Sequence, residues 1–508
     1  GCPLYVEPEE LADSGEDESD DTANAVIAAL YPTEVVEDDG TDVDSWENCK
    51  TCSEDNPHMI YTTADLDKIR THTHTENGIT TITGYFKLAN DIVFEDSEFE
   101  ENGAFYNGGY GWLAIGKPSI DFNAGVGENQ VICFAGSFDG NDHSIKNLLI
   151  DGQDYIAALF TRVSSSGIIT NLTIENSSFN LSCSDGGTTR TGRWLGGIAA
   201  VNLGTIDSCK VLDSVFYSVG GLAGAISSQC SGTQRNCTVK NVILKSFSST
   251  GKSAGNNGDK TGLISGTVSD GVISNCIVSE STVYGQSRGT GGIAGMNYTG
   301  TIENCTVDNC DISNDHELCG GISGGNFADN GDCTYKNCNV TDSKITGRSR
   351  AGGIVGSHSG GNIYSFVLSN CSVDHTTITG LAQYPGIATA GSSYVSAIIG
   401  DLGKFKSLSI SDCKINDVTL GMDEESLSNQ ASRASQIICG VTPSSNSTTV
   451  QISNIDAENI IFDLGHNYAG NVTDVPSENN GSYILCVPKR IGYRFDGWYA
   501  DSNFSGNA

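Results

Sequence analysis

Apolar and polar residues repeat along most of this sequence in one fixed arrangement. In the stretch GTIENCTVDNCDI, residues 300–312, the apolar positions are Ile302, Cys305, Val307 and Ile312. Residues two apart lie on the same face of a β-strand, so Cys305 and Val307 share a face. The steps of three and five residues on either side each require a bend. We therefore predict short strands separated by tight bends.

The pattern occurs ten times, and successive copies are spaced from 24 residues (145 to 169) to 42 residues (410 to 452). In one copy Gln234 replaces the first apolar residue. The nine further copies are Ile145, Leu148, Ile150 and Tyr155; Ile169, Leu172, Ile174 and Phe179; Ile206, Cys209, Val211 and Phe216; Gln234, Cys237, Val239 and Leu244; Ile273, Cys276, Val278 and Val283; Tyr335, Cys338, Val340 and Ile345; Leu368, Cys371, Val373 and Ile378; Ile410, Cys413, Ile415 and Leu420; Ile452, Ile455, Ala457 and Phe462.

Asparagine occupies the first bend in most copies. Asn tolerates the left-handed backbone conformation that a sharp bend needs. We expect the side-chain amides of stacked copies to form a hydrogen-bonded ladder, and we expect these side chains to be buried, which makes the Asn-x-Ser/Thr sequons among them weak evidence of glycosylation. The predicted ladder consists of Asn147, Asn171, Asn236, Asn275, Asn304, Asn337, Asn370 and Asn454.

A glycine-rich apolar strand precedes most copies, as in GGIAG at residues 291–295. Together with the repeat it gives three strands and three corners, which is one coil of a parallel β-helix. The predicted fold is all-β, a right-handed parallel β-helix of about ten or more coils with an N-terminal cap. At ~4.8 Å per coil, ten coils make a rod of roughly 50 Å.

The chain divides into four predicted regions. Residues 1–55 are acidic and are predicted to be a linker. Residues 56–140 are predicted to form the cap and first coils, including a helix over Thr62–Arg70. Residues 141–469 form the β-helix, and residues 470–508 form a separate C-terminal segment. A solenoid grows by adding coils, so the 508-residue length does not require several cores.

The combination of GGIxG and G-T-I-x-N-C resembles the GLUG repeat family, and the lead-in GSFDGNDHSIKNL at residues 136–148 is similar to the start of GLUG-containing surface proteins. The resemblance covers about residues 58–465 and implies a bacterial adhesin or another exported protein. The family also occurs beside immunoglobulin-A-cleaving metallopeptidases. Their zinc motif H-E-x-x-H is absent, because His316-Glu317 is followed by Leu-Cys-Gly.

The segment PKRIGYRFDGWYADSNFSG, residues 488–506, is similar to the internalin B-type repeat of Listeria and Bacteroides surface proteins. Only the later part of such a module is present. The resemblance therefore implies that the natural protein continues beyond Ala508.

Seven of the 18 cysteines share one offset of the repeat: Cys209, Cys237, Cys276, Cys305, Cys338, Cys371 and Cys413. Stacked neighbours would have parallel Cβ vectors near ~4.8 Å apart, beyond the ~3.5–4.5 Å that a disulfide prefers. We expect reduced, buried thiols that act as small apolar residues. Outside this ladder, Cys230, Cys310, Cys319 and Cys333 are left open to pairing.

Possible metal ligands are few. Cys49 and Cys52 form a single C-x-x-C, with only His58 near it in sequence, and zinc needs four ligands, so a local disulfide or a structural role is favoured. His72 and His74 are expected to be exposed. The acidic residues 38–47 do not match the spacing of a calcium loop, so a solvated acidic linker is favoured and Ca²⁺ is kept only as a minor alternative. We predict no metal or cofactor site.

The net charge of −35 disfavours nucleic acid and anionic lipid as partners, and no apolar run is long enough to span a membrane. We therefore expect an extracellular, secreted or surface-anchored adhesin or scaffold that binds glycans or surface proteins. The alternatives are a β-helical polysaccharide lyase or glycosidase and a self-assembling filament. Acidic residues do not recur at one offset in adjacent coils, so we predict no catalytic residues and no enzyme.

Overall fold

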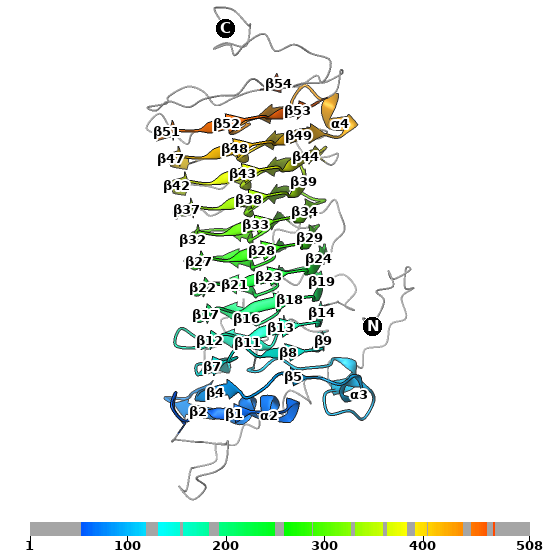
Figure 1. Cartoon of the computed structure of the whole chain (residues 1–508), viewed down its shortest axis with the longest axis vertical. Helices are drawn as coiled ribbons and strands as arrows, with labels where there is room; N and C mark the ends of the chain where they lie inside the picture. Colours follow the sequence, from blue (N-terminus) through cyan, green and yellow to red (C-terminus); the bar gives the residue numbers. More distant parts are fainter. Residues whose placement is uncertain are drawn as a thin grey trace, which may run out of the picture.

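The protein is a parallel β-helix, as predicted. The computed structural model describes residues 52–117, 131–152, 156–181, 193–248, 259–286, 288–326, 331–358, 363–383, 392–403, 405–439, 449–464 and 471–472. Within these ranges the coils stack into one rod with five long sheets along its sides. Figure 1 shows the stack running from the N-terminal cap at one end to β54 at the other.

We number the sheets 1 to 5 in the order in which one coil visits them. Sheet 1 contains β10 (Ile156–Ala157), β15 (Trp194–Gly196), β20 (Leu222–Gly224), β25 (Lys260–Gly262), β30 (Gly289–Gly291), β35 (Leu318–Gly320), β40 (Arg350–Gly352), β45 (Tyr394–Ser396), β50 (Arg433–Ser435) and β54 (Asn471–Val472). Sheet 2 contains β2 (Thr73–Glu76), β3 (Ile79–Ile82), β6 (Cys133–Phe134), β11 (Phe160–Val163), β16 (Ala199–Asn202), β21 (Ser227–Cys230), β26 (Ser265–Val268), β31 (Ala294–Asn297), β36 (Ser323–Asn326), β41 (Val355–His358) and β46 (Ile399–Leu402).

Sheet 3 contains β1 (His58–Ile60), β4 (Tyr85–Leu88), β7 (Ser137–Asp139), β12 (Ile168–Thr170), β17 (Thr205–Asp207), β22 (Thr233–Arg235), β27 (Val272–Ser274), β32 (Thr301–Glu303), β37 (Cys333–Lys336), β42 (Ile363–Ser369), β47 (Phe405–Ser411) and β51 (Thr449–Ser453). Sheet 4 contains β5 (Ile92–Val93), β8 (Ser144–Lys146), β13 (Thr173–Glu175), β18 (Lys210–Leu212), β23 (Thr238–Lys240), β28 (Ile277–Ser279), β33 (Thr306–Asp308), β38 (Asn339–Thr341), β43 (Ser372–Asp374), β48 (Lys414–Asn416) and β52 (Asp456–Glu458). Sheet 5 contains β9 (Leu149–Asp151), β14 (Ser178–Leu181), β19 (Val215–Val219), β24 (Ile243–Phe247), β29 (Thr282–Gly285), β34 (Asp311–Asn314), β39 (Lys344–Arg348), β44 (Thr377–Leu381), β49 (Thr419–Met422) and β53 (Ile461–Asp463).

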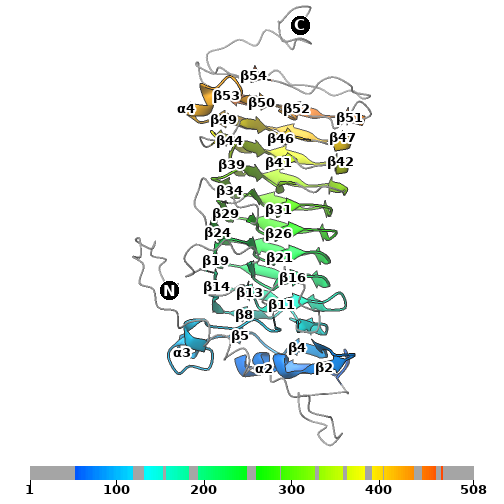
Figure 2. The same ribbon diagram turned by 180° about the vertical axis from the view of Figure 1, so that it is seen from behind.

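The coils are right-handed, as predicted. In Figure 1 the chain passes from β12 through β13 to β14 across the near side while it rises, and in Figure 2 it passes from β14 through β16 toward sheet 3 across the opposite side. Pairing between coils is parallel, with the antiparallel β2–β3 pair of the cap as an exception. The sense agrees with the right-handed crossover that twisted parallel strands favour.

Each full coil has five short strands, so the prediction of three strands and three corners is wrong. The glycine-rich segment at residues 291–295 is split between β30 and β31, with a bend at Gly292 and Ile293. A Cβ on Gly292 would lie 2.8 Å from Cγ2 of Val307, on the far side of the same coil. The sequence pattern shows the glycines but not this close approach, which lets sheets 1 and 4 lie on either side of a thin core.

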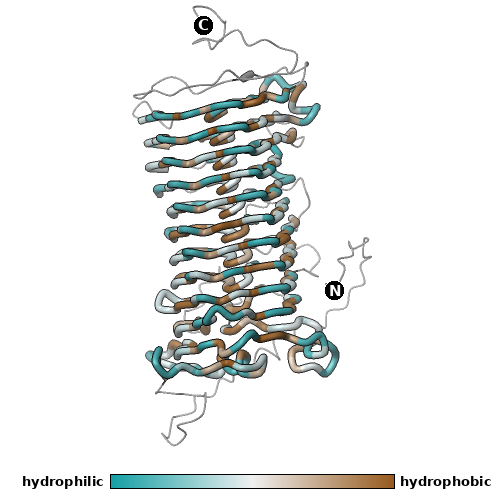
Figure 3. The backbone as a smooth tube through the Cα atoms, viewed as in Figure 1, coloured by the Kyte–Doolittle hydropathy of each residue, from teal (hydrophilic) through white to brown (hydrophobic). Residues whose placement is uncertain are grey.

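The two bends predicted within the repeat are confirmed. Asn304, between β32 and β33, has φ +54°, and Asn309, between β33 and β34, has φ +49°. We call these bends the 3–4 corner and the 4–5 corner, after the sheets that they join. Side chains at the inward-facing positions of the repeat, such as Ile302, Val307 and Ile312, are fully buried in one continuous core. Figure 3 shows the resulting alternation of hydrophobic and hydrophilic residues along the coils.

The prediction assigned the first copy of the repeat to the wrong strands. Ile145 pairs with Ile174, which lies in sheet 4, rather than with Ile169 in sheet 3. Phe138 is the true partner of Ile169. Asn147 therefore lies at the 4–5 corner, although its φ of +58° is left-handed as expected. Apolar residues have similar spacing around the 3–4 corner and the 4–5 corner, so one copy was assigned to the wrong corner.

The cap contains the predicted helix as α2 (Thr63–Lys68), with Thr62 as its N-cap. The side chain of Thr62 accepts a hydrogen bond from the backbone of Asp65, and the Asp65 carboxylate accepts one from the backbone of Thr62, which completes a capping box. Three short helical segments follow it in the N-terminal region, η1 (Ile69–Thr71), α3 (Asp96–Phe99) and η2 (Asn107–Gly109), whereas α4 (Glu424–Leu427) follows β49 near the other end of the rod. No helix among the described residues has the length and apolar character needed to cross a lipid bilayer.

Candidate binding face

The outer face of sheet 5 carries apolar side chains that the core does not use. Val215 and Ile243 are in register on β19 and β24 and are 36% and 43% exposed. Tyr217 lies 5.2 Å from Phe247, and Phe247 lies 5.5 Å from Tyr284, measured between ring centroids. We call these five residues the aromatic strip. It crosses three successive coils, β19, β24 and β29, on the right-hand edge of Figure 1.

The strip combines apolar surface with polar groups. The rings of Tyr217, Phe247 and Tyr284 are half-buried, so one side of each is supported by the rod. Gln286 donates a hydrogen bond to the Tyr284 hydroxyl, 2.9 Å away, which fixes the position of that ring. Contiguous exposed apolar surface of this kind marks interaction sites more often than scattered single residues do.

A groove follows the 4–5 corner next to the strip, and we call it the acidic groove. It has a volume of ≈ 600 Å³ and includes three carboxylates, those of Glu280, Asp311 and Asp342, with the ammonium group of Lys344. Its lining consists of Glu280, Ser281, Thr282, Asn309, Cys310, Asp311, Asp342, Ser343, Lys344, His375 and Thr377. Thr282 and Tyr284 belong to the same strand, so the groove and the strip form one continuous surface.

Imidazole and carboxylate groups meet where the groove ends. The Nδ1 of His375 lies 2.9 Å from Asp374, and its Nε2 lies 3.3 Å from Asp417 of the next coil. These three side chains offer one ligand atom each within 4.8 Å of one another. His375 and Asp417 are exposed, so water competes for any cation at this position.

The groove does not follow from the repeat pattern, because its acidic residues do not share a single offset of the repeat. Glu280 and Asp342 occupy the 4–5 corner itself, whereas Asp311 begins the following strand, β34. A bend brings these different offsets to one edge of the rod. The signal available in the sequence was an acidic residue at or just after the second bend in several neighbouring copies.

Charged residues are also buried, at the corner where sheet 5 turns into sheet 1. Asp259 is 3% exposed and its carboxylate accepts a hydrogen bond from the backbone of Gly221. Burial raises the pKa of Asp259 to about 6, and burial lowers the pKa of the adjacent Lys260 to about 8. Arg193 is 5% exposed and donates to the carbonyl of Val219, 2.9 Å away.

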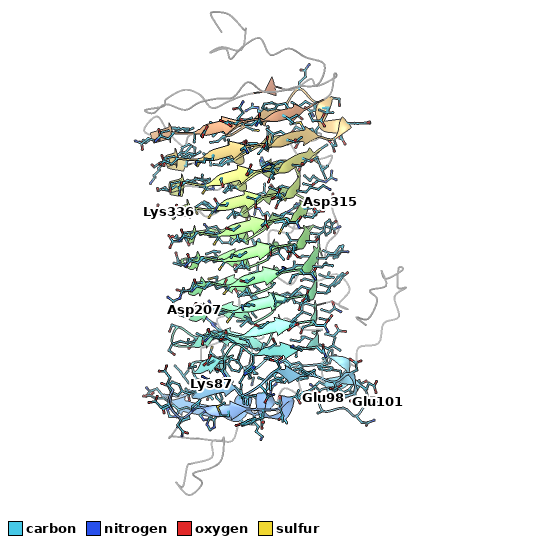
Figure 4. The ribbon with its side chains drawn as sticks, viewed as in Figure 1. Lys87, Glu98, Glu101, Asp207, Asp315 and Lys336 are labelled. Carbon is cyan, nitrogen blue, oxygen red and sulfur yellow. The ribbon has the colours of Figure 1, made fainter. Side chains whose placement is uncertain are left out.

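Charged side chains on the outside of the rod pair between coils. Arg235 lies 2.8 Å from Asp207 of the preceding coil, and Arg348 lies 2.7 Å from Asp315. Figure 4 shows the labelled side chains of Asp207, Asp315 and Lys336 at the margins of the stack. These pairs link neighbouring coils. The aromatic strip contains one charged side chain, that of Lys245, which lies in register between Tyr217 and Tyr284.

The predicted asparagine ladder is confirmed at seven of its eight positions, and Asn147 forms part of the neighbouring corner instead. All eight have positive φ, and Ser208 and Asp412 take the same conformation in copies without Asn. Bonds between coils run from the Nδ2 of Asn171 to Asp139, Asn236 to Asp207, Asn275 to Asn236, Asn337 to Asn304, Asn370 to Asn337 and Asn454 to Asp412, at 2.7–3.2 Å. The expectation that these side chains are buried is wrong, since most are exposed at the corner.

The seven ladder cysteines are free thiols in the core, as predicted. Each Sγ donates to the carbonyl two residues earlier, as Cys305 does to Glu303 at 3.3 Å. Burial raises the pKa of the Cys209 and Cys413 thiols well above the usual range. A protonated, buried thiol is a poor nucleophile, so this ladder serves packing.

The off-ladder cysteines do not pair with one another. Cys230, Cys310, Cys319 and Cys333 are all buried, and none of them forms a disulfide with another described cysteine. They lie in different places along the coil, with Cys230 in sheet 2, Cys319 in sheet 1 and Cys333 in sheet 3. Cys310 follows the 4–5 corner, where other coils place Ser281 or Ser343.

The predicted exposure of His72 is wrong, whereas His74 is exposed as expected. His72 is buried in the cap, and its Nε2 lies 3.2 Å from the Nε2 of His58. Cys52 lies beside them and forms no disulfide with another described cysteine, and Cys49 lies outside the described residues. The acidic residues 38–47 and the internalin B-like residues 488–506 also lie outside them.

Comparisons with known proteins agree with the repeat. Residues 286–313, which span the coil from β30 to β34, match the family model described as the GLUG motif, so the resemblance is confirmed. Over 211 residues, 41% of this chain, the sequence is 28% identical to halomucin of Haloquadratum walsbyi, and that match covers 2% of halomucin. A crystal structure of a candidate immunoglobulin A1 protease from Bacteroides ovatus is similar over 79% of this chain and 86% of that one, with 19% identity and a TM-score of 0.33, too low to carry an argument.

Proposed function

We propose that this GLUG-motif rod is part of an extracellular surface protein, and that it binds glycan chains along the outer face of sheet 5 without cleaving them. The aromatic strip is the observation that carries the proposal. The C–H faces of sugar rings pack against aromatic rings, while tyrosine hydroxyls and nearby polar groups meet the sugar hydroxyls. A strip that continues over successive coils suits an extended chain of sugars.

The charge of the protein favours neutral glycans over acidic ones. The net charge is −35, and the three carboxylates of the acidic groove, Glu280, Asp311 and Asp342, outnumber Lys245, the charged side chain between Tyr217 and Tyr284. Like charges across a binding surface oppose association, so uronic acids and sulfated sugars are poor ligands. The GLUG motif and the similarity to halomucin support an extracellular setting.

Cleavage of a polysaccharide is the second candidate, and the acidic groove is the observation that favours it. A glycosidase needs two carboxyl groups on opposite sides of the scissile bond, and a lyase needs a base with a means of neutralising the sugar carboxylate. Glu280, Asp311 and Asp342 supply carboxylates, and Lys344 supplies an amine. Binding without cleavage is preferred because the strip, rather than the groove, offers supported ring surfaces.

The experiment that tests the proposal is binding of the purified chain to an array of glycans and matrix proteins. Turnover of each polysaccharide is measured on the same samples, with and without Ca²⁺. The proposal predicts retention of neutral glycans and intact polysaccharides. Release of shortened or unsaturated sugars would establish the enzyme instead, retention of proteins alone would replace glycans as the ligand, and sedimentation as long assemblies without any ligand would favour the filament.

Variants locate the binding surface. Tyr217→Ala and Tyr284→Ala remove rings from the strip, and Thr379→Ala changes the outward position that corresponds to Tyr284 further along sheet 5. The proposal predicts weaker glycan binding for the two tyrosine variants and unchanged binding for Thr379→Ala. Asp342→Asn in the groove should leave glycan binding unchanged, whereas a loss of turnover in that variant would support the enzyme.

A further inference from the structure

Three side chains of types that ligate metal ions converge in the N-terminal cap, far from the aromatic strip along the rod. Cys52 precedes β1, His58 begins β1, and His72 follows η1. The Nε2 atoms of the two histidines are 3.2 Å apart, and the Sγ of Cys52 lies 3.8 Å from the Nε2 of His72. All three ligand atoms lie within 4.8 Å of one another.

These separations fit a tetrahedral zinc ion. With Zn–N of about 2.0–2.1 Å and Zn–S of about 2.3 Å, tetrahedral angles place two nitrogens about 3.3–3.4 Å apart and a nitrogen and a sulfur about 3.6 Å apart. The observed 3.2 Å and 3.8 Å differ from these values by a few tenths of an ångström. Two imidazoles and a thiolate favour zinc over calcium or magnesium, which prefer oxygen ligands.

The histidines are held in place by their surroundings. His72 is 3% exposed, its backbone N donates to Ile69 and its carbonyl accepts from Thr83. The rings of His58 and His72 both pack on Phe86, at centroid distances of 5.7 and 5.4 Å. A fixed pair of ligands loses little conformational freedom when the ion binds.

Gly84 makes room for the buried ring. A Cβ at this position would lie 2.8 Å from Cε1 of His72, and the φ of +113° is one that side chains rarely adopt. The cap thus brings a histidine ring into contact with bare backbone on one side and with the second histidine on the other.

The proposed site consists of described residues only. Cys49 stands three residues before Cys52 in the sequence, but it lies outside the described residues and is not one of the three proposed ligands.

An N–H···N hydrogen bond between two neutral imidazoles is the simplest other explanation of the 3.2 Å contact. That bond joins the Nε2 of His72 to His58 alone, whereas the same Nε2 also lies 3.8 Å from the Sγ of Cys52. One ion that all three atoms coordinate accounts for both contacts.

We propose that Cys52, His58 and His72 bind a zinc ion that fastens the segment before β1 to the first coil. β1 is the terminal strand of sheet 3, and an unprotected terminal strand invites pairing with other chains. The ion would fix the residues that lead into this strand. The three side chains supply three of the four positions of a tetrahedral zinc ion, and the fourth falls to a group outside this cluster. The role of the ion is structural and independent of the proposed glycan binding.

The test uses the whole chain, freed of metal with a chelator, reduced and titrated with Zn²⁺ against a coloured competitor. The expected result is one tightly bound ion per chain. Cys52→Ser and His72→Gln should each weaken binding by at least about 10–100-fold, the loss that follows when even an outer partner of a zinc ligand is removed. His74→Gln, two residues away and exposed, is the matched control and should bind like the original chain.

Co²⁺ provides a measurement that does not depend on the variants folding. The original chain should give the intense visible bands of tetrahedral Co²⁺ and the ultraviolet band of a cobalt–thiolate bond, and Zn²⁺ should displace both. Weak octahedral bands, no thiolate band, or equal zinc affinity in all the variants would overturn the proposal.

Discussion

Asn337 donates its side-chain Nδ2 to the Oδ1 of Asn304, 2.7 Å away, across two successive coils. Asn370 makes the same bond to Asn337 at 2.8 Å, and all three residues have φ between +52° and +54°. One residue type therefore supplies both the left-handed turn and the bond to the next coil. The 3–4 corner is where the repeat fixes the register of the stack.

Replacing Asn337 separates these two roles. Asn337→Ala should lower the free energy of unfolding by about 2–3 kcal/mol, because a side chain with Cβ costs about 1–2 kcal/mol in the left-handed region and a hydrogen bond contributes about 1 kcal/mol. Asn337→Gly keeps the turn and loses only the bonds, so its loss should be smaller. Urea unfolding checks the order, and equal stability of the alanine and glycine variants would contradict it.

The cysteine ladder should be unreactive in the folded protein. Cys276, Cys305 and Cys338 are buried, whereas Cys133 is only half-buried. Short alkylation under native conditions, followed by peptide mass spectrometry, should label Cys133 well before any of the three. Labelling of the ladder at the rate of Cys133 would show that these thiols are accessible and that the core description is wrong.

Gly292 should not tolerate a larger side chain. Its Cβ would meet Val307 and the carbonyl of Gly321, so Gly292→Ala should destabilise the coil by about 1–3 kcal/mol through overpacking. Gly421→Ala is the matched control, because the nearest atoms to a Cβ there are 3.8 Å away. Thermal unfolding of the two variants measures the difference in stability. Similar melting temperatures would contradict the close approach of sheets 1 and 4 across a thin core.

The buried Asp259 predicts an unusual pH dependence. Its pKa rises from the usual 3.8 to about 6 in the folded chain, so between these values the folded state binds the proton more tightly than the unfolded state. Its contribution to stability is therefore present below pH 4 and is lost as the pH rises to about 6, on the order of 3 kcal/mol at most.

Asp259→Asn removes this titration while keeping an oxygen that can accept from the backbone of Gly221. The difference in unfolding free energy between the variant and the original chain should change by an amount of that order between pH 4 and pH 6.5. If the unfolding free energies of the variant and of the original chain differ by the same amount at every pH, the pKa of Asp259 is not raised by folding.

The repeat was predictable from the sequence because every second residue of a β-strand faces the core and is apolar. Ile302, Val307 and Ile312 identified two bends correctly, and Asn304 indicated the backbone conformation of the first. The number of strands was not predictable in the same way. Whether a glycine-rich segment is straight or bent depends on what lies opposite, and Gly292 faces Val307 through the coil.

The candidate sites were less visible. The aromatic strip depends on pairing between coils, which places Tyr217 near Phe247 although the two lie in different strands. The cysteine–histidine cluster depends on the cap, where α2 and η1 return the chain so that His72 meets His58. These contacts join residues that lie far apart in the sequence. None of the four side chains occupies one of the apolar positions that define the repeat, so the repeat pattern does not predict the contacts.

The central claim is that the aromatic strip binds glycans, and the most direct measurement is the affinity of the original chain and of Tyr217→Ala/Tyr284→Ala for the glycan that the array retains best. Calorimetry on folded samples, with Thr379→Ala as control, gives the comparison. Removing stacked aromatic contacts worth about 0.5–1.5 kcal/mol each should weaken binding at least several-fold, with the control unchanged. Equal affinity in all three proteins, or a glycan that is cleaved rather than retained, would contradict the account.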